Sequence, residues 1–338
     1  MTRRRPASRR AARRAAGLAA LVVLPALSAA CGGDPGERRP GADATATPSP
    51  TTTSPPTPGT APTSDPAPAA PALGAPAPAG DADELARRLV AAEDVVRDPA
   101  ATEDALRQAA FDTQVLYRQL ARRPAWHDRV LAAAGPYRAT VTDHLEARRG
   151  LRSVLTRLSG ELPAWRIVRP APLDDLRTHY AEGERAFGVP WEVLAAVNLV
   201  ETGFGRIRGL STAGARGPMQ FIPSTWARYG KGDIDDPRDA VLAAARYLAA
   251  SGGTTPGGLD DALHSYNHHD GYVSGVRAYA RVLERDPGAL AGLYRWQIVY
   301  LSQRGDVWLP EGYRRRAPLP VERYVERHPE RLLGTATD

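Results

Sequence analysis

One long segment near the N-terminus limits which parts of this 338-residue chain can fold. Residues 32–80 contain 13 prolines together with many Ala, Thr, Ser and Gly, and Leu73 is their only large aliphatic residue. Such a segment cannot bury enough apolar surface to offset the entropy that is lost when it becomes ordered. We therefore expect residues 31–80 to be a disordered or polyproline-II linker, and we expect the packed core to lie within residues 81–338.

The residues before this linker have the layout of an export signal. Residues 1–30 hold seven arginines and no acidic residue, and they end in an apolar stretch that Pro25 interrupts and that is too short to span a bilayer comfortably. The formal charge of +6 belongs to this leader, because 44 basic residues less these seven leave 37 against 38 acidic ones. We therefore expect a signal peptide over residues 1–30, and we expect no nucleic acid as a partner.

Cys31 is the only cysteine and directly follows the leader. The run LSAACGG at residues 27–33 resembles a bacterial lipobox, although Ser28 stands where Leu is usual. The resemblance implies export, lipidation of Cys31 and anchoring to the outer face of the cytoplasmic membrane, with the linker as a tether that spans roughly 150 Å when extended. The alternative for Cys31 is ordinary signal cleavage that leaves a free thiol. The alternative for the linker is a low-complexity insert that does not have to span a distance.

Apolar residues recur with helical spacing over residues 81–165, and charged residues fill the other faces. We expect three or four helices here, packed against the next domain, with Asp98-Pro99 at the start of one and Gly160 at the end of the last. No catalytic constellation is present in this helical segment. Its arginine pairs are typical of solvated helix faces, and a contact with an anionic polymer is the alternative. The apolar stripes are Leu85, Leu89, Ala92 and Val96; Leu106, Ala110, Leu116, Tyr117 and Leu120; and Val141, Leu145, Leu151, Leu155 and Leu158.

Glu201 occupies an unusual position for a carboxylate. A helix is expected from Val189-Pro190-Trp191 to Gly203, and Glu201 shares the face of its apolar residues Leu194 and Val197. The apolar neighbours and the carbonyl end of the helix both disfavour the ionised carboxylate and should raise its pKa. A carboxylic acid that stays protonated near neutral pH is what a glycosidase general acid requires. Periodicity alone, however, favours an ordinary Glu at a helix end.

Three blocks of sequence change that interpretation. They are ETGFG at residues 201–205, STAGARGPMQFIPSTW at residues 211–226 and ALHSYN at residues 262–267. In this order they resemble the SLT domain of bacterial lytic transglycosylases, which belongs to the lysozyme-like superfamily, over residues 170–285. The resemblance implies a mainly α, lysozyme-like catalytic domain that acts on peptidoglycan strands. The run HHDG at residues 268–271 replaces the commoner AGPG and is closer to a membrane-bound branch of the family.

The resemblance also implies roles for individual residues. Glu201 matches the single catalytic Glu, and Met219 with Gln220 matches a pair that lines the sugar cleft. Tyr266 and Asn267 match a Tyr-Asn pair that faces the catalytic Glu and the sugar. The implied substrate-binding residues are Ser211, Met219, Gln220, Tyr266 and Asn267.

The implied reaction needs no cofactor. Glu201 cleaves the β-1,4 bond between MurNAc and GlcNAc as acid and then base, and 1,6-anhydro-MurNAc forms without water. Two alternatives stay open, a hydrolytic muramidase at the same Glu and a non-catalytic peptidoglycan-binding lipoprotein. A protein partner of the helical segment 81–165 could coexist with either, and the sequence does not identify one.

Other residues near the three blocks have ordinary explanations. Most glycoside hydrolases use a second carboxylate, yet most of the candidates stand at helix starts. We expect no metal, because Tyr266 and Asn267 separate His264 from His268 and His269 and a helix break is expected there. The carboxylate candidates are Asp233, Asp235, Asp236, Asp239, Asp260, Asp261 and Asp270.

Residues 286–338 are expected to be a C-terminal extension with a small β-hairpin against the catalytic domain. The strands are expected at 296–301 and 307–309, with a turn at 304–306 and a short helix at 321–328. Trp296 and Trp308 could stack on sugars, but core packing is the simpler role for them.

Overall fold

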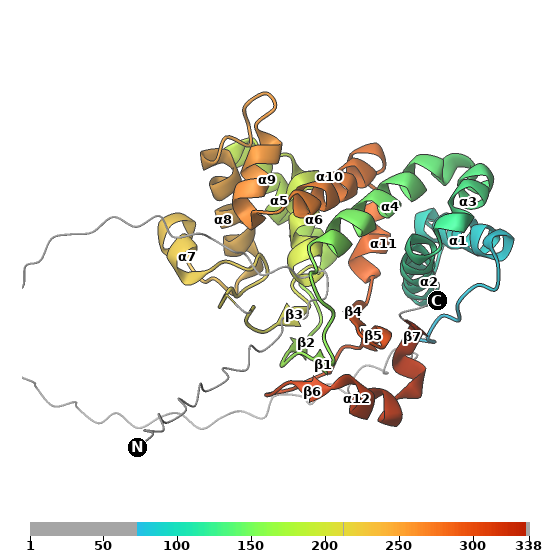
Figure 1. The fold of residues 1–338 in the computed structure, drawn as a ribbon. Coiled ribbons are helices and arrows are strands. Elements are labelled where there is room, and N and C mark those ends of the chain that lie inside the picture. The colour runs from blue at the N-terminus through green and yellow to red at the C-terminus, as the bar shows by residue number, and fades with distance from the viewer. Residues whose placement is uncertain (1–72, 212, 336–338) are drawn as a thin grey trace, which may run out of the picture. The chain divides into compact units, whose positions relative to one another are not determined.

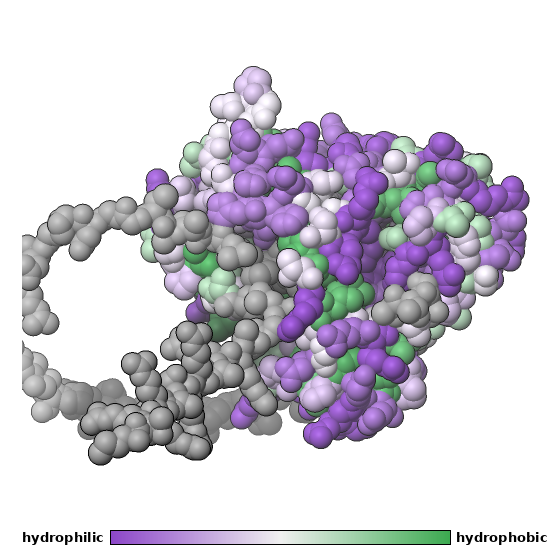
Figure 2. Space-filling model, in the orientation of Figure 1, coloured by the Kyte–Doolittle hydropathy of each residue, from purple (hydrophilic) through white to green (hydrophobic). Residues whose placement is uncertain are grey.

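The computed structural model describes residues 73–211 and 213–335 (Figure 1). The predicted signal peptide, the lipidation at Cys31 and the linker up to residue 72 lie outside these residues. The described part is mainly helical with small two- and three-stranded sheets, which confirms the predicted fold class. None of its helices is both long and apolar enough to cross a membrane. On the face shown in Figure 2, polar residues predominate and apolar residues form small separate patches.

The N-terminal helical segment contains four α-helices and two short 3₁₀ turns, at Pro124–Trp126 and Gly135–Tyr137. The first helix starts after Asp81, whose side chain accepts a hydrogen bond from the Glu84 amide at 2.8 Å. The prediction that Asp98-Pro99 starts a helix is wrong: Asp98 ends the first helix because a residue before proline avoids the helical conformation, and Thr102 caps the second. The helices are α1 (Ala82–Arg97), α2 (Glu103–Arg122), α3 (His127–Ala133) and α4 (Arg138–Ser153).

The last helix of this segment is shorter than expected, since α4 ends at Ser153 and not near Gly160. Residues 73–80, which the sequence assigns to the linker, pack against α2. The side chain of Gln119 bonds both the amide of Ala79, at 2.9 Å, and its carbonyl, at 2.8 Å. The backbone amide of Gly74 donates to Gln108 at 3.1 Å.

The central region is built around one buried helix, α6 (Trp191–Thr202). Most of its residues are buried, because α5 (Leu173–Phe187), α8 (Pro237–Ala250) and α10 (Asp270–Arg285) pack against it. The helix expected from residue 189 to Gly203 is therefore present as α6. The remaining elements are β1 (Glu161–Leu162), β2 (Arg166–Ile167), β3 (Ile207–Arg208), α7 (Pro223–Tyr229), α9 (Leu259–Asn267) and α11 (Ala289–Arg295).

The helical segment packs directly on the central region through α4 and α10, as predicted (Figure 1). Glycines allow the two helices to approach closely: a methyl group at Gly150 would lie 2.7 Å from the carbonyl oxygen of Gly271. Ion pairs flank this contact. Arg281 bonds Asp143 at 2.9 Å and Glu146 at 2.7 Å.

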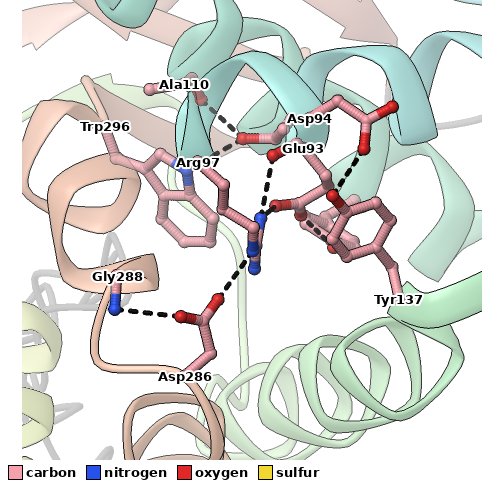
Figure 3. A network of polar contacts seen from close by, with 10 residues as sticks. Glu93, Asp94, Arg97, Ala110, Tyr137, Asp286, Gly288 and Trp296 are labelled. Atoms are coloured by element: carbon pink, nitrogen blue, oxygen red, sulfur yellow. Dashed lines mark hydrogen bonds and ion pairs between the residues drawn. The ribbon is translucent and has the colours of Figure 1, made fainter. Parts of the chain in front are cut away.

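A second polar network joins the C-terminal ends of α1 and α10 (Figure 3). Arg97 bonds Glu93 on its own helix at 2.5 Å and Asp286, the C-cap of α10, at 2.6 Å. Asp286 also accepts a hydrogen bond from the Gly288 amide at 2.9 Å, so it fixes the chain as it enters α11. The helical segment and the central region thus share partly buried ion pairs as well as apolar contacts.

The C-terminal extension contains the predicted hairpin, β4 (Ile298–Ser302) with β5 (Gly305–Leu309), and a strand that the sequence did not suggest. That strand, β7 (Leu332–Thr335), pairs with β5, and β6 (Leu319–Pro320) pairs with β1. The hairpin turns at residues 303–304, and a short helix, α12 (Val321–Arg327), follows at the expected place. Trp296 and Trp308 are 6% and 5% exposed, so they pack in the core.

Candidate active site

Glu201 lies in the last turn of α6, just before Gly203 ends the helix in the left-handed conformation with φ of 58°. Its side chain is fully buried, and burial raises its pKa from the ordinary 4.5 to about 8. Among the described residues, Oε2 of Glu201 has no hydrogen-bond partner. The site therefore holds a neutral carboxylic acid at pH 7, as the helix position and the apolar neighbours of Glu201 suggested.

Tyr272, in the first turn of α10, provides the hydrogen bond to this carboxyl group. Its hydroxyl lies 2.8 Å from Oε1 of Glu201, and the bond lowers the pKa of Glu201 against the larger effect of burial. Tyr272 is not among the site residues predicted from the sequence. A signal was present, because Tyr272, Val276, Tyr279 and Leu283 form a stripe at helical spacing that aims the Tyr hydroxyl inward.

The turn that carries Met219 and Gln220 is held to α6 at a single carbonyl. The oxygen of Pro218 accepts hydrogen bonds from Asn198 at 2.9 Å and from Thr202 at 2.5 Å. Asn198 is oriented in turn by the hydroxyl of Tyr180 at 2.7 Å. Since Thr202 directly follows Glu201, this turn is fixed next to the buried carboxyl group.

Tyr266 holds the same turn from the other side. Its hydroxyl donates to the carbonyl of Met219 at 2.7 Å, and its ring is parallel to that of Tyr272 with centroids 6.2 Å apart. Burial and the nearby Glu201 carboxyl raise the pKa of Tyr266. The structure thus places Tyr266 close to Glu201, but its hydroxyl bonds the turn.

The other predicted residues differ in their surroundings. Met219 is fully buried in the apolar core, and Gln220 is 2% exposed with a left-handed backbone at φ of 49°. Asn267 is buried and ends α9. Ser211 lies in a loop, where its hydroxyl accepts from the Ala215 amide at 2.9 Å, so it organises that loop.

The acidic residues of the region mostly have structural partners. Asp236 caps α8 by accepting from the Asp239 amide at 2.9 Å, and Asp260 forms an ion pair with Arg277 at 3.2 Å. His269 caps α10 by accepting from the Gly271 amide at 2.9 Å. Within the described ranges, no group of three His, Cys, Asp or Glu is placed to hold a metal ion.

The region that contains this site is similar to known proteins. Residues 179–286 match the family described as Transglycosylase SLT domain. The chain is 32% identical over 141 residues to Membrane-bound lytic murein transglycosylase F of Thiobacillus denitrificans, which is 40% of this chain and 30% of the relative. It is 28% identical over 154 residues to the protein of that name from Nitrosospira multiformis, which is 44% of this chain and 31% of the relative.

The chain therefore spans about three tenths of the length of these curated relatives. A comparison with solved structures gave no significant match. The matched range starts within α5 and ends after α10, so it contains Glu201, Tyr272 and the turn between them. Residues 179–286 are thus similar to the SLT domain of bacterial lytic transglycosylases.

Proposed function

We propose that this protein is a peptidoglycan lytic transglycosylase that cleaves the β-1,4 bond between MurNAc and GlcNAc with Glu201 as its acid and base. One observation carries the proposal: a fully buried carboxyl group with a pKa of about 8 lies inside a domain of the SLT family. Such a group keeps its proton at neutral pH and can donate it to a leaving oxygen.

The proposed reaction uses one carboxyl group twice. Protonated Glu201 gives its proton to the glycosidic oxygen as the bond from C1 of MurNAc to that oxygen breaks. The acetamido group stabilises the cation at C1. The Glu201 carboxylate then takes the proton of the C6 hydroxyl, whose oxygen bonds to C1 and closes the 1,6-anhydro ring. No water is consumed, and Glu201 ends protonated as it began.

The surroundings of Glu201 stabilise both its protonated form and its carboxylate. Burial favours the protonated form before the first step, and the Tyr272 hydroxyl favours the carboxylate that exists between the two steps. Met219 and Gln220, on a turn fixed by Asn198, Thr202 and Tyr266, would contact the sugar together with Asn267 and Ser211. Because Glu201 is fully covered, sugar binding has to displace part of its cover.

A decisive test is digestion of purified peptidoglycan by the protein and by its Glu201→Gln variant, with the released muropeptides identified by mass spectrometry. Anhydro-MurNAc ends that require Glu201 are the expected result. Reducing ends that require Glu201 would assign the site to a muramidase, in which water replaces the C6 hydroxyl. Binding without release by either protein would assign it to the non-catalytic peptidoglycan-binding lipoprotein.

We also propose that the protein works in the cell envelope, exported by residues 1–30 and anchored by lipid at Cys31 to the outer face of the cytoplasmic membrane. The names of the curated relatives include the words membrane-bound, and the lipobox-like run at residues 27–33 supports an anchor. A Cys31→Ser variant should move from the membrane fraction to the soluble fraction. Retention in the membrane fraction would argue against this anchor.

A further inference from the structure

A row of three arginines crosses a small sheet beside the candidate active site. Arg166 of β2 stands opposite Arg208 of β3, and on its other side Arg166 forms an antiparallel bridge with Arg314. Residues directly opposite in such pairs point to the same face. The neighbouring Ile167 and Ile207 are buried at 3% and 2% exposure, so they pack on the opposite face and the arginines point away from the core.

The described residues supply this arginine row with no neutralising carboxylate. Like charges directly opposite each other destabilise a sheet. In the described part of the chain, no carboxylate lies within ion-pair distance of Arg166, Arg208 or Arg314, although Arg208 donates to the backbone carbonyl of Asp235 at 3.0 Å. An arginine row of this kind is suited to binding carboxylates from outside the chain, because each guanidinium can hold one with two parallel bonds.

A pocket of about 390 Å³ is lined by two members of this row. Its single carboxylate, Asp235, is already paired with Arg216, so its arginines retain an excess of positive charge. Leu210 adds an apolar surface and is 64% exposed, which is unusual for a large aliphatic side chain in this protein. The lining residues are Arg166, Arg208, Gly209, Leu210, Arg216, Gly217 and Asp235.

The pocket is continuous with the turn at the active site. Gly217 lines the pocket, and its carbonyl accepts from both the amide and the side chain of Gln220 at 3.1 Å. The sugars of the glycan strand that reach Glu201 are bulky and mainly neutral, whereas the peptides attached to MurNAc carry carboxylates and the methyl groups of alanine. The charge and the apolar surface of the pocket therefore match the peptide branch of the strand better than its sugars.

We propose that the pocket lined by Arg166, Arg208 and Leu210 binds the stem peptide of peptidoglycan through its free carboxylates. This inference rests on the proposed function, which it extends from the glycan strand to the peptide. It makes the enzyme selective for strands that still carry their peptides.

The test compares KM and kcat on three substrates: strands with free stem carboxylates, strands with amidated stems, and strands stripped of peptides by an amidase. Arg166→Ala should raise KM for the first substrate about tenfold, Arg166→Glu should raise it further, and kcat should stay unchanged. The wild type should bind amidated strands as weakly as the Arg166→Ala variant binds strands with free carboxylates. Arg166 and the control Arg323→Ala are both exposed, and the control should match the wild type.

Two results would overturn the inference. One is an unchanged KM of Arg166→Ala on strands with free carboxylates. The other is an equal rise of KM on stripped strands, which would assign the arginines to the glycan. Co-sedimentation of Glu201→Gln and Glu201→Gln/Arg166→Ala with peptide-bearing strands measures the same contact without cleavage. Suppose that Glu201→Gln binds these strands more tightly than Glu201→Gln/Arg166→Ala, but the wild type cleaves none of them. That result would refute the proposed function and support peptide binding in this pocket.

Discussion

The hydroxyl of Tyr272 donates a hydrogen bond to Oε1 of Glu201 at 2.8 Å, while Oε2 of the same carboxyl has no partner among the described residues. The bond favours the carboxylate, and burial favours the acid more strongly, so the pKa of Glu201 settles at about 8. The two oxygens thus have different tasks. Oε1 is fixed by α10, and Oε2 is the oxygen that would contact the substrate in the proposed function.

The pKa of Glu201 predicts how activity depends on pH. An acid with a pKa of about 8 stays protonated at neutral pH, so the release of muropeptides should hold up to about pH 8 and fall above it as Glu201 ionises. Measuring kcat/KM from pH 5 to 10 tests this expectation. A fall that begins near pH 5 would show that Glu201 has an ordinary pKa.

Removing the Tyr272 hydroxyl should raise the pH above which activity falls, which we call the alkaline limit. Tyr272→Phe deletes a bond that stabilises the carboxylate, so the pKa of Glu201 and the alkaline limit of activity should rise by about one pH unit. Tyr266→Phe is the matched control, since its hydroxyl bonds the carbonyl of Met219 and not Glu201. It should lower kcat/KM without moving the limit. Equal shifts of the alkaline limit in both variants would contradict a specific effect of the Tyr272 hydroxyl on the pKa of Glu201.

Glu201 should reduce the stability of the fold at neutral pH. Its pKa is about 8 in the folded chain against an ordinary 4.5, so above pH 4.5 the unfolded chain releases a proton that the folded chain keeps. The free energy of unfolding therefore declines as pH rises from about 4.5 to 8. Glu201→Gln should be more stable than the wild type by roughly 1–3 kcal/mol at pH 7.5.

Urea unfolding of both proteins at several pH values measures this difference. The gain in Glu201→Gln should shrink as pH falls and approach zero well below pH 4.5, where the wild-type carboxyl is protonated in both states. Glu326→Gln makes the same substitution on an exposed side chain and should leave stability unchanged at every pH. A gain that is independent of pH would attribute the effect to packing.

The buried position of Glu201 could be predicted from the sequence because its evidence is local, whereas its assignment as the acid depended on the resemblance of three blocks within residues 201–267. The apolar spacing of Leu194 and Val197, together with the breaker Gly203, places Glu201 on the buried face at the end of a helix. The hairpin was predictable for the same reason, since alternation and a turn lie within a few residues of each other.

Contacts between distant segments could not be obtained in this way. Tyr272 meets Glu201 only because α10 packs across α6, and the pattern around Tyr272 indicates a buried face without naming its neighbour. Likewise β7 looks like a tail in sequence and becomes a strand only beside β5. Apolar periodicity determines which face is buried, but many partners satisfy it equally well.

The turn next to Glu201 should tolerate no side chain at Gly217. Gly217 has φ of 79°, and a methyl group there would lie 2.0 Å from the carbonyl oxygen of Ile234. Gly217→Ala should therefore displace the turn that carries Met219 and Gln220 and abolish most activity. Gly214 is the matched control, because it has the same φ of 79° with nothing within 4 Å.

Gly214→Ala then isolates the backbone strain, which costs about 1–2 kcal/mol of stability. It should keep most of the activity at 25 °C, whereas Gly217→Ala should lose it even where circular dichroism shows a folded protein. Similar losses in the two variants would mean that φ alone, and not the contact with Ile234, constrains the turn.

The last prediction concerns Asp306, which ties the hairpin to α2. Its carboxylate is 1% exposed and bonds Arg118 and Arg122, and these arginines keep its pKa well below the ordinary value of 3.8. A lowered pKa contributes stability above pH 3.8 that is lost only as pH falls towards the folded value. Asp306→Asn should cost about 3–5 kcal/mol at pH 7, because it removes the buried carboxylate that Arg118 and the half-buried Arg122 share. Asp174→Asn makes the same change in a pair whose carboxylate is 91% exposed and should cost less than about 1 kcal/mol. Equal losses in urea unfolding at pH 7 would show that the hairpin does not depend on this buried pair.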